Sequence, residues 1–326
     1  MDGTTPLAAI DVPARPPSRA VAIDGGTLNV YEWSAPETVP TLIFCHATGL
    51  NALTYRHMLG RLEGEARILA LDARGHGRST ATADPKTLVD WYTYREDLLR
   101  ALDALGVDKA VLAGHSMGAV VSLLVAAHAP DRVTGLVLAD PPLFAQAICY
   151  INDLRKRSGF GSYIPPIAKR AAVRRPVWRS RAEVFAAFRG YAVFSGWPDE
   201  VLADYIADGF EAPNGRGTGG QETDGGDVTL ACRPEWEAAT FTASLSDHWP
   251  AIKAVACPAS VLYAERQSTV AQPVRSRLAR VTTTMDFETI KGSSHFLPME
   301  FPDAVLAAIR RHLAAGIPPA ISPSTG

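Results

Sequence analysis

The stretch 110-AVLAGHSMGAVV-121 decides the fold of this chain. Residues 111–113 are apolar and β-prone, which predicts a buried strand, and residues 119–129 are typical of a helix. Gly114 and Gly118 lack a Cβ, so Ser116 can adopt a strained backbone conformation that lifts its Oγ clear of the sheet. The first N–H groups of the helix then point beside Oγ, where an anionic intermediate needs donors. The pattern predicts a nucleophilic serine at a strand-to-helix turn (a nucleophile elbow), rather than a plain packing turn.

Length and composition predict one domain with a large insertion and a small-molecule partner. At 326 residues the chain is long for one domain and short for two, and 47% hydrophobic residues are ample for a core. A formal charge of -2 gives no reason to expect nucleic acid or an anionic membrane surface as a partner. We therefore expect neither to bind.

The cysteines and the N-terminal segment predict a cytoplasmic, soluble protein. Four cysteines without Cys-x-x-Cys spacing favour free thiols in a reduced compartment and no metal site; they are Cys45, Cys149, Cys232 and Cys257. Residues 1–18 are Pro-rich and lack the basic and apolar regions of a signal peptide. No apolar run is long enough to span a bilayer.

Apolar strands alternate with helices along most of the chain, which predicts an α/β fold. A hairpin is expected over residues 19–33, and the next segments are expected to form a mostly parallel sheet covered by helices on both faces. The predicted strands are 41–45, 68–71, 111–113, 133–139, 260–264 and 285–290, and the predicted helices are 53–62, 94–105, 119–129, 273–280 and 302–314.

The alternation breaks over residues 143–250, which we interpret as an insertion. No acid stands between Asp153 and Glu183, whereas nine basic residues lie there; they are Arg155, Lys156, Arg157, Lys169, Arg170, Arg174, Arg175, Arg179 and Arg181. The second half is acidic, and residues 214–226 are Gly-rich and predicted to be mobile. We expect the core to comprise residues 19–142 and 251–315, with a disordered arm (1–18) and a disordered tail (316–326).

Four motifs in order make the chain resemble the α/β-hydrolase superfamily over about residues 19–313. They are His46-Ala47-Thr48-Gly49, Asp72-x-Arg74-Gly75-His76-Gly77-x-Ser79, Gly114-His115-Ser116-Met117-Gly118 and Gly292-Ser293-Ser294-His295-Phe296. The resemblance implies an α/β-hydrolase fold in which the nucleophilic Ser is followed by an acid and then by a His. It also implies that residues 143–250 form a mainly helical cap (lid).

This resemblance makes His295 the expected base and leaves two candidates for the acid. The family often has an Asp after the strand before the His loop, but here Gln267 stands in that place and cannot carry the charge. Asp140 ends the strand after the elbow, and the stiff Pro141-Pro142 follows it, so we favour it as the acid. Glu265 is the alternative acid, and whichever residue is not the acid is expected to form an ion pair or a cap.

The oxyanion hole is expected to use the backbone N–H groups of Met117 and Thr48. Ala47 replaces the glycine usual in this family but leaves the Thr48 N–H available, and the Thr48 hydroxyl could add a third donor. We expect His46 to brace this loop, and we expect structural roles for His76 and His115.

Together these residues predict a serine esterase (a carboxylesterase) that needs no metal and no organic cofactor. Ser116 at the elbow argues against dehalogenase and epoxide hydrolase chemistry, which needs a carboxylate nucleophile. Lactone hydrolysis, carbon-carbon bond hydrolysis and thioester hydrolysis remain alternatives on the same triad. A ligand receptor without catalysis is the alternative from another class.

The substrate is expected to be a small ester or lactone chosen by the insertion. Its aromatic and aliphatic side chains either line an apolar lid or form the core of the insertion; they are Phe160, Tyr163, Ile164, Trp178, Phe185, Phe188, Tyr191, Phe194 and Trp197. The basic run either receives a substrate carboxylate, forms a solvated face, or pairs with the acidic half. The sequence does not predict an oligomeric state.

Overall fold

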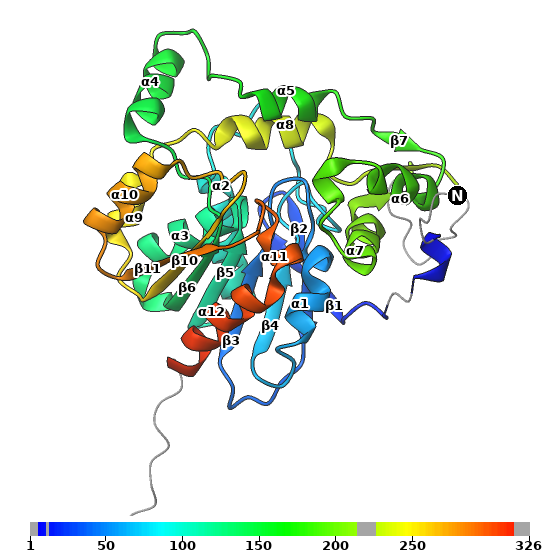
Figure 1. The fold of residues 1–326 in the computed structure, drawn as a ribbon, viewed down its shortest axis with the longest axis horizontal. Coiled ribbons are helices and arrows are strands. Elements are labelled where there is room, and N and C mark those ends of the chain that lie inside the picture. Colours follow the sequence, from blue (N-terminus) through cyan, green and yellow to red (C-terminus); the bar gives the residue numbers. More distant parts are fainter. Residues whose placement is uncertain (1–5, 11–12, 214–225, 316–326) are drawn as a thin grey trace, which may run out of the picture.

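A computed structural model describes residues 6–10, 13–213 and 226–315. Its centre is an eight-stranded sheet with the order β1-β2-β4-β3-β5-β6-β10-β11 (Figure 1). β1 pairs antiparallel with β2, and β2 pairs antiparallel with β4, whereas all later pairings are parallel. The strands are β1 (Ser18–Ile23), β2 (Gly26–Trp33), β3 (Thr41–Cys45), β4 (Arg67–Leu71), β5 (Ala110–His115), β6 (Val133–Ala139), β10 (Ala259–Ala264) and β11 (Met285–Ile290).

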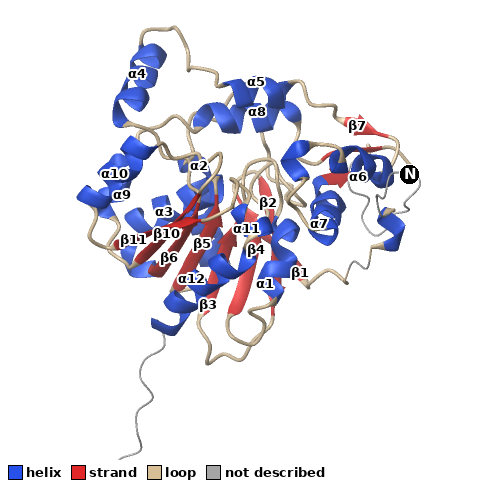
Figure 2. Ribbon diagram, viewed as in Figure 1, coloured by secondary structure: helices blue, strands red, loops and turns tan. Residues whose placement is uncertain are grey.

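Alternate residues of the central strands lie in two hydrophobic clusters, one on each face of the sheet. On β5, Leu112 belongs to one cluster, while Val111 and Ala113 belong to the other. Both faces are therefore buried, which is why these strands are continuously apolar. Figure 2 shows helices on both sides of the strands. The helices of the core are α1 (Arg56–Gly60), α2 (Tyr92–Ala104), α3 (Met117–His128), α9 (Trp249–Ala254), α10 (Gln272–Val281), α11 (Leu297–Glu300) and α12 (Pro302–Ala315), with 3-10 turns η2 (Ala52–Tyr55) and η3 (Pro130–Arg132).

Helices dominate the described part of the 143–250 insertion, but it also contains a small antiparallel sheet of order β7-β9-β8. Helix α5 packs against α8, and α4 stands out from the rest in Figure 1. The chain has returned to the core by α9, which packs on α3. The elements are α4 (Gln146–Arg157), α5 (Pro166–Ala172), β7 (Val177–Trp178), α6 (Arg181–Arg189), η4 (Ala192–Phe194), α7 (Asp199–Gly209), β8 (Phe210–Glu211), β9 (Val228–Leu230) and α8 (Pro234–Ala243).

Most aromatic residues of the insertion pack on one another. Phe188 stacks on Phe194 with ring centroids 5.0 Å apart and meets Trp178 edge to face, so these rings pack on one another. Phe160 and Tyr191, by contrast, are exposed. Much of the aromatic content therefore forms a core within the insertion.

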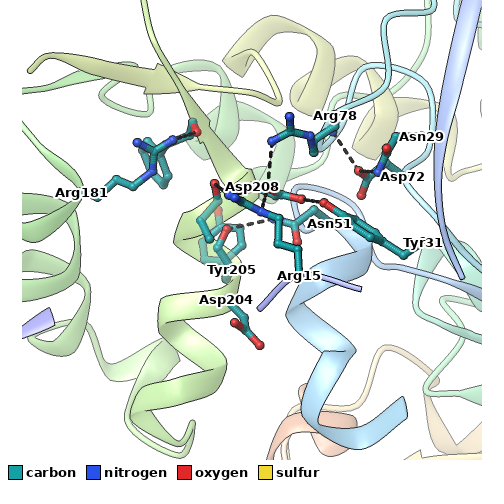
Figure 3. A network of polar contacts seen from close by, with 12 residues as sticks. Arg15, Asn29, Tyr31, Asn51, Asp72, Arg78, Arg181, Asp204, Tyr205 and Asp208 are labelled. Atoms are coloured by element: carbon teal, nitrogen blue, oxygen red, sulfur yellow. Dashed lines mark hydrogen bonds and ion pairs between the residues drawn. The ribbon is translucent and has the colours of Figure 1, made fainter. Parts of the chain in front are cut away.

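Helix α7 joins the insertion to the core through buried charges (Figure 3). Arg56 on α1 forms a bidentate ion pair with Asp204, and both side chains are almost fully buried. Asp208 accepts hydrogen bonds from Tyr31 and from Arg15. Because a buried charge is stable only when it is paired, these contacts tie α7 firmly to the core.

The expected N-terminal arm is ordered in part. The 3-10 helix η1 (Leu7–Ala9) contacts α6, and buried Arg56 donates to the carbonyl oxygens of Pro13 and Ala14. The segment is ordered because the buried guanidinium of Arg56 has donors that Asp204 does not accept, and these donors need other acceptors. Residues 1–5 and 11–12, the expected disordered tail 316–326, and most of the Gly-rich tract (214–225) lie outside the described residues.

None of the helices in the described ranges combines the length and the apolar character that a bilayer crossing requires. In the same ranges, no three His, Cys, Asp or Glu side chains come together in a way that would hold a metal ion.

Candidate active site

The elbow between β5 and α3 holds Ser116 in a strained conformation. Ser116 has φ = 53° and ψ = −117°, and its N–H donates to the Ala139 carbonyl at 2.9 Å. The flanking glycines are needed because the backbones approach so closely. A Cβ on Gly114 would lie 2.4 Å from the carbonyl carbon of Gly118, and a Cβ on Gly118 would lie 2.1 Å from the Cys45 carbonyl oxygen. The turn therefore packs the start of α3 directly against the end of β3.

His295 and Asp140 meet at the carboxyl edge of the sheet. His295 lies in the loop after β11, and its Nδ1 is 2.7 Å from Oδ2 of Asp140, which follows β6. Since a carboxylate only accepts, Nδ1 carries the ring proton, and Nε2 of a neutral His295 keeps its lone pair. A neutral ring held in this tautomer can accept a proton at Nε2.

The Asp140 carboxylate is fully buried and surrounded by donors. Oδ1 accepts from the Ala264 N–H at 3.1 Å and the Ser268 hydroxyl at 2.5 Å, and Oδ2 accepts from the Thr269 N–H at 3.0 Å. Burial alone raises the pKa of Asp140, but the hydrogen bond to His295, the charge of His295 and these donors outweigh it and lower the pKa to about 2. Asp140 is therefore ionised throughout the neutral range.

The alternative acid, Glu265, lies elsewhere. Its carboxylate is exposed and accepts from the Gly292 N–H at 2.8 Å, so it caps the turn that leads to the His295 loop. Gln267, in the place where the acid was expected, is exposed and has φ = 55°. The structure thus brings His295 together with Asp140. The Glu265 carboxylate instead accepts a hydrogen bond from the Gly292 N–H.

In the loop after β3, the backbone N–H groups on either side of Thr48 are occupied. The Ala47 N–H donates to Tyr55 Oη at 3.2 Å, and the Gly49 N–H donates to His76 Nε2 at 3.1 Å. Within the described chain, the Thr48 N–H between them has no protein acceptor, and neither has the Met117 N–H at the start of α3. Two backbone donors are thus left available near the elbow.

Two further histidines hold this loop. His46 Nδ1 donates to its neighbour's carbonyl, and Nε2 accepts from the Ala73 N–H at 2.9 Å. His76 Nδ1 donates to the Arg74 carbonyl at 2.9 Å, while Nε2 receives the Gly49 N–H. Burial lowers the pKa of His46 to about 3 and that of His76 to about 4, so both rings are neutral.

His115 connects the loop of Thr48 with the loop of His295. Its Nε2 donates to the His295 carbonyl at 2.8 Å, and its Nδ1 is 2.8 Å from Tyr55 Oη. Because Nε2 is the donor, Nδ1 of the neutral ring accepts from Tyr55, whose oxygen in turn accepts the Ala47 N–H. Burial, with a smaller effect of the charge of His295, lowers the pKa of His115 to about 3. One directed chain of hydrogen bonds therefore runs from the Ala47 N–H through Tyr55 and His115 to the His295 carbonyl.

A cavity of about 360 Å³ lies between the core and the insertion. Thr48 and Phe296, the neighbour of His295, lie in its wall on the side of the core. Phe188, Phe194 and Tyr205 are among the aromatic residues that line it on the side of the insertion. The cavity thus reaches Thr48, which carries a free backbone donor, and Phe296, which follows the expected base His295.

Comparison with known proteins identifies the family. The model of the alpha/beta hydrolase family matches residues 42–308. The chain belongs to this family.

Similar proteins match this alpha/beta hydrolase over most of its length. It is 27% identical over 300 residues to 2-(acetamidomethylene)succinate hydrolase of Mesorhizobium japonicum. The aligned residues cover 91% of this chain and 95% of that one. A crystal structure of E-2-(acetamidomethylene)succinate hydrolase superimposes with a TM-score of 0.70 at 24% identity, over 91% of this chain and 98% of that chain. A shorter match, 30% identical over 116 residues, is to 3-oxoadipate enol-lactonase 1 of Acinetobacter baylyi, covering 36% of this chain and 42% of that one.

Several residues of the hydrolase that support the site were missed by sequence reasoning. Ser268 and Thr269 follow the unexpected Gln267, and their hydroxyls donate to Asp140 from the loop after β10. Two hydroxyl residues in succession at the carboxyl edge of a strand could have drawn attention. No sequence signal pointed to Tyr55, because a tyrosine in the predicted helix 53–62 is equally well explained by packing in the core.

Proposed function

We propose that this alpha/beta hydrolase is a serine hydrolase that cleaves carboxylic esters through Ser116, His295 and Asp140. The hydrogen bond of 2.7 Å between His295 Nδ1 and Asp140 Oδ2 carries the proposal, because it orients a base from one strand end by a carboxylate from another. The hydrogen bond from His115 to the His295 carbonyl supports it further, since it holds the base loop beside the residue that precedes Ser116.

In the proposed reaction, Ser116 Oγ attacks the ester carbonyl while His295 Nε2 accepts its proton. The ionised Asp140 stabilises the imidazolium, which then protonates the leaving alcohol. Water then attacks the acyl-enzyme while His295 Nε2 accepts its proton, and the imidazolium gives this proton to Ser116 Oγ as the bond to the acyl group breaks and the acid is released. Acylation and deacylation each begin with a neutral His295, and both need an ionised Asp140 throughout.

The Thr48 and Met117 N–H groups are the proposed oxyanion donors. Both lack a protein acceptor in the described chain, whereas the N–H groups of Ala47 and Gly49 are occupied by side chains. A donor that is already aimed and unpaired stabilises a developing oxyanion without reorganisation. Ala47 in place of a glycine is compatible with this arrangement, because its N–H faces Tyr55 and not the substrate.

Lactone hydrolysis is the second candidate function. A lactone is a cyclic ester, so the same three residues open it by the same steps. The likeness to an enol-lactonase of Acinetobacter baylyi favours this candidate, although it covers only 36% of the chain.

Labelling with a fluorophosphonate tests the proposal directly. We expect one equivalent of label on the wild-type protein and none on Ser116→Ala, with full labelling of Ser195→Ala, which removes an exposed serine of the insertion. Unlabelled wild type would support a ligand receptor without catalysis, and label that persists in Ser116→Ala would contradict the assignment of Ser116 as the nucleophile. Hydrolysis of acyclic esters and of lactones of equal carbon number then distinguishes the two candidate substrates.

A further inference from the structure

Three arginines from one short stretch of the insertion line the cavity. Arg170 lies on α5, and Arg174 and Arg175 follow it, whereas Glu237 on α8 is the acidic residue of the wall. Arginine stays protonated in proteins, so the described wall of the cavity carries an excess of positive charge. Charge of one sign on low-dielectric walls attracts ligands of the opposite sign.

The three guanidinium groups differ in their partners. Arg174 Nη1 pairs with Glu237 at 2.5 Å, and Nη2 donates to Tyr205 Oη at 3.2 Å. Arg175 pairs with Glu183 at 3.0 Å and lies over the Trp178 ring at 4.0 Å. Across the described ranges, the Arg170 guanidinium makes no hydrogen bond and no ion pair. Its donors are the ones left for a ligand.

The paired arginine lies close to the proposed oxyanion donor. A Cβ built on Gly49 would be 2.5 Å from Glu237 Oε1 and 3.6 Å from Arg174 Nη1. Gly49 directly follows Thr48, so Glu237 holds the Arg174 guanidinium against the loop where the ester carbonyl would bind. An anion bound beside Arg174 therefore lies close to the loop that carries the Thr48 N–H.

We propose that Arg170, together with Arg174 of the same cavity wall, binds a carboxylate of the substrate, so that this enzyme prefers small esters or lactones that carry a free carboxylate. The inference rests on the proposed function. The planar guanidinium presents paired donors that match the two oxygens of a carboxylate. Phe188 and Phe194 contribute the apolar wall against which the carbon skeleton packs.

The test compares monomethyl succinate, which carries one carboxylate, with its neutral analogue dimethyl succinate. Hydrolysis is followed in a pH-stat, and the rate for the diester is halved for its two ester groups. We expect wild-type kcat/KM to favour the monoester by at least about tenfold, and this preference to fall with salt. Arg170→Ala should lose about tenfold on the monoester through KM, with the diester unchanged.

Lys169→Ala is the matched control, since Lys169 is an exposed cation next to Arg170 on the same helix but does not line the cavity. It should keep the preference of the wild type. Equal rates for the two esters in the wild-type protein, or equal losses in the two variants, would overturn the carboxylate site.

A binding measurement separates this proposal from the proposed function. Calorimetric titration of Ser116→Ala should show tighter binding of monomethyl succinate than of dimethyl succinate, and Arg170→Ala in the same background should abolish the difference. If the wild type resists fluorophosphonate but this difference persists, the hydrolase proposal fails and the carboxylate site stands. If labelling succeeds and the difference is absent, the carboxylate site fails alone.

Discussion

The two sides of the candidate site are built differently. On the core side, the Asp140 carboxylate is held by backbone N–H groups and short hydroxyl side chains at strand ends, and it has almost no freedom to move. On the insertion side, long arginine side chains project from a seven-residue helix and from the loop after it, and Arg170 is exposed.

This difference suits the core side to the chemical step and the insertion side to the choice of substrate. A catalytic base loses efficiency when its geometry shifts by a fraction of an ångström, so it is best held by parallel strands. A cavity wall on a short helix and loops can change its side chains without disturbing the sheet. We therefore expect substitutions on the core side to lower turnover and those on the insertion side to change substrate preference.

Asp140→Asn is expected to have the largest effect. The amide cannot carry the charge that stabilises the imidazolium, and it no longer selects the tautomer with the proton on His295 Nδ1. We expect kcat to fall by about 10⁴-fold with little change in KM, as in other triads. Glu265→Gln is the control and should cost less than about threefold, since it changes only a cap on Gly292. If the Glu265 variant lost more activity than the Asp140 variant, the acid would be Glu265.

Removing the buried ion pair tests how the two sides are joined. Arg56→Ala leaves the Asp204 charge buried without its partner, and it should lower the free energy of unfolding by about 3–5 kcal/mol in urea denaturation. The exposed pair of Arg61 with Asp303 is the control, and Arg61→Ala should cost less than about 1 kcal/mol. Equal losses in the two variants would show that α7 is not anchored by this pair.

The buried His248 should make the free energy of unfolding depend on pH. His248 stacks on Trp91, its ring nitrogens have no partner in the described chain, and burial lowers its pKa to about 4. Between pH 6.5 and 4 the unfolded state binds the proton and the folded state does not, so this residue reduces stability as the pH falls.

His248→Leu should therefore remove about 2 kcal/mol of the stability loss between pH 7 and pH 5, measured by urea denaturation at both values. His128→Leu, at an exposed position, should leave the pH dependence unchanged. The same loss in the His248 variant and the wild type would contradict the prediction.

Tyr55→Phe should have the smallest effect of these changes. It removes the donor to His115 Nδ1 and the acceptor of the Ala47 N–H, leaving two buried polar groups unpaired. We expect about a tenfold fall in kcat with KM nearly unchanged, because the loops of His295 and Thr48 lose a common support while the cavity does not. Tyr92→Phe, whose hydroxyl makes no hydrogen bond in the described chain, is the control. A rise in KM without a fall in kcat would contradict this role.

Much of the fold followed from local patterns. The hairpin, the buried strands and the helices at both ends of the chain were predicted within a few residues, because continuous apolar runs and glycine turns are local signals. The small sheet of the insertion was not predicted, since its strands are two or three residues long and their pairing partners lie far apart in sequence.

The sequence by itself determined the family, the elbow with its strained Ser116, and the short list of partners at His295, Asp140 and Glu265. It did so because the glycines of the elbow and the order of the motifs are properties of consecutive residues. Only the tertiary structure distinguished Asp140 from Glu265 by contact with His295, linked Tyr55 to His115, and placed Arg174 beside Gly49. These relations join residues separated by 27 to 155 positions, and chain packing alone decides which side chains meet over such separations.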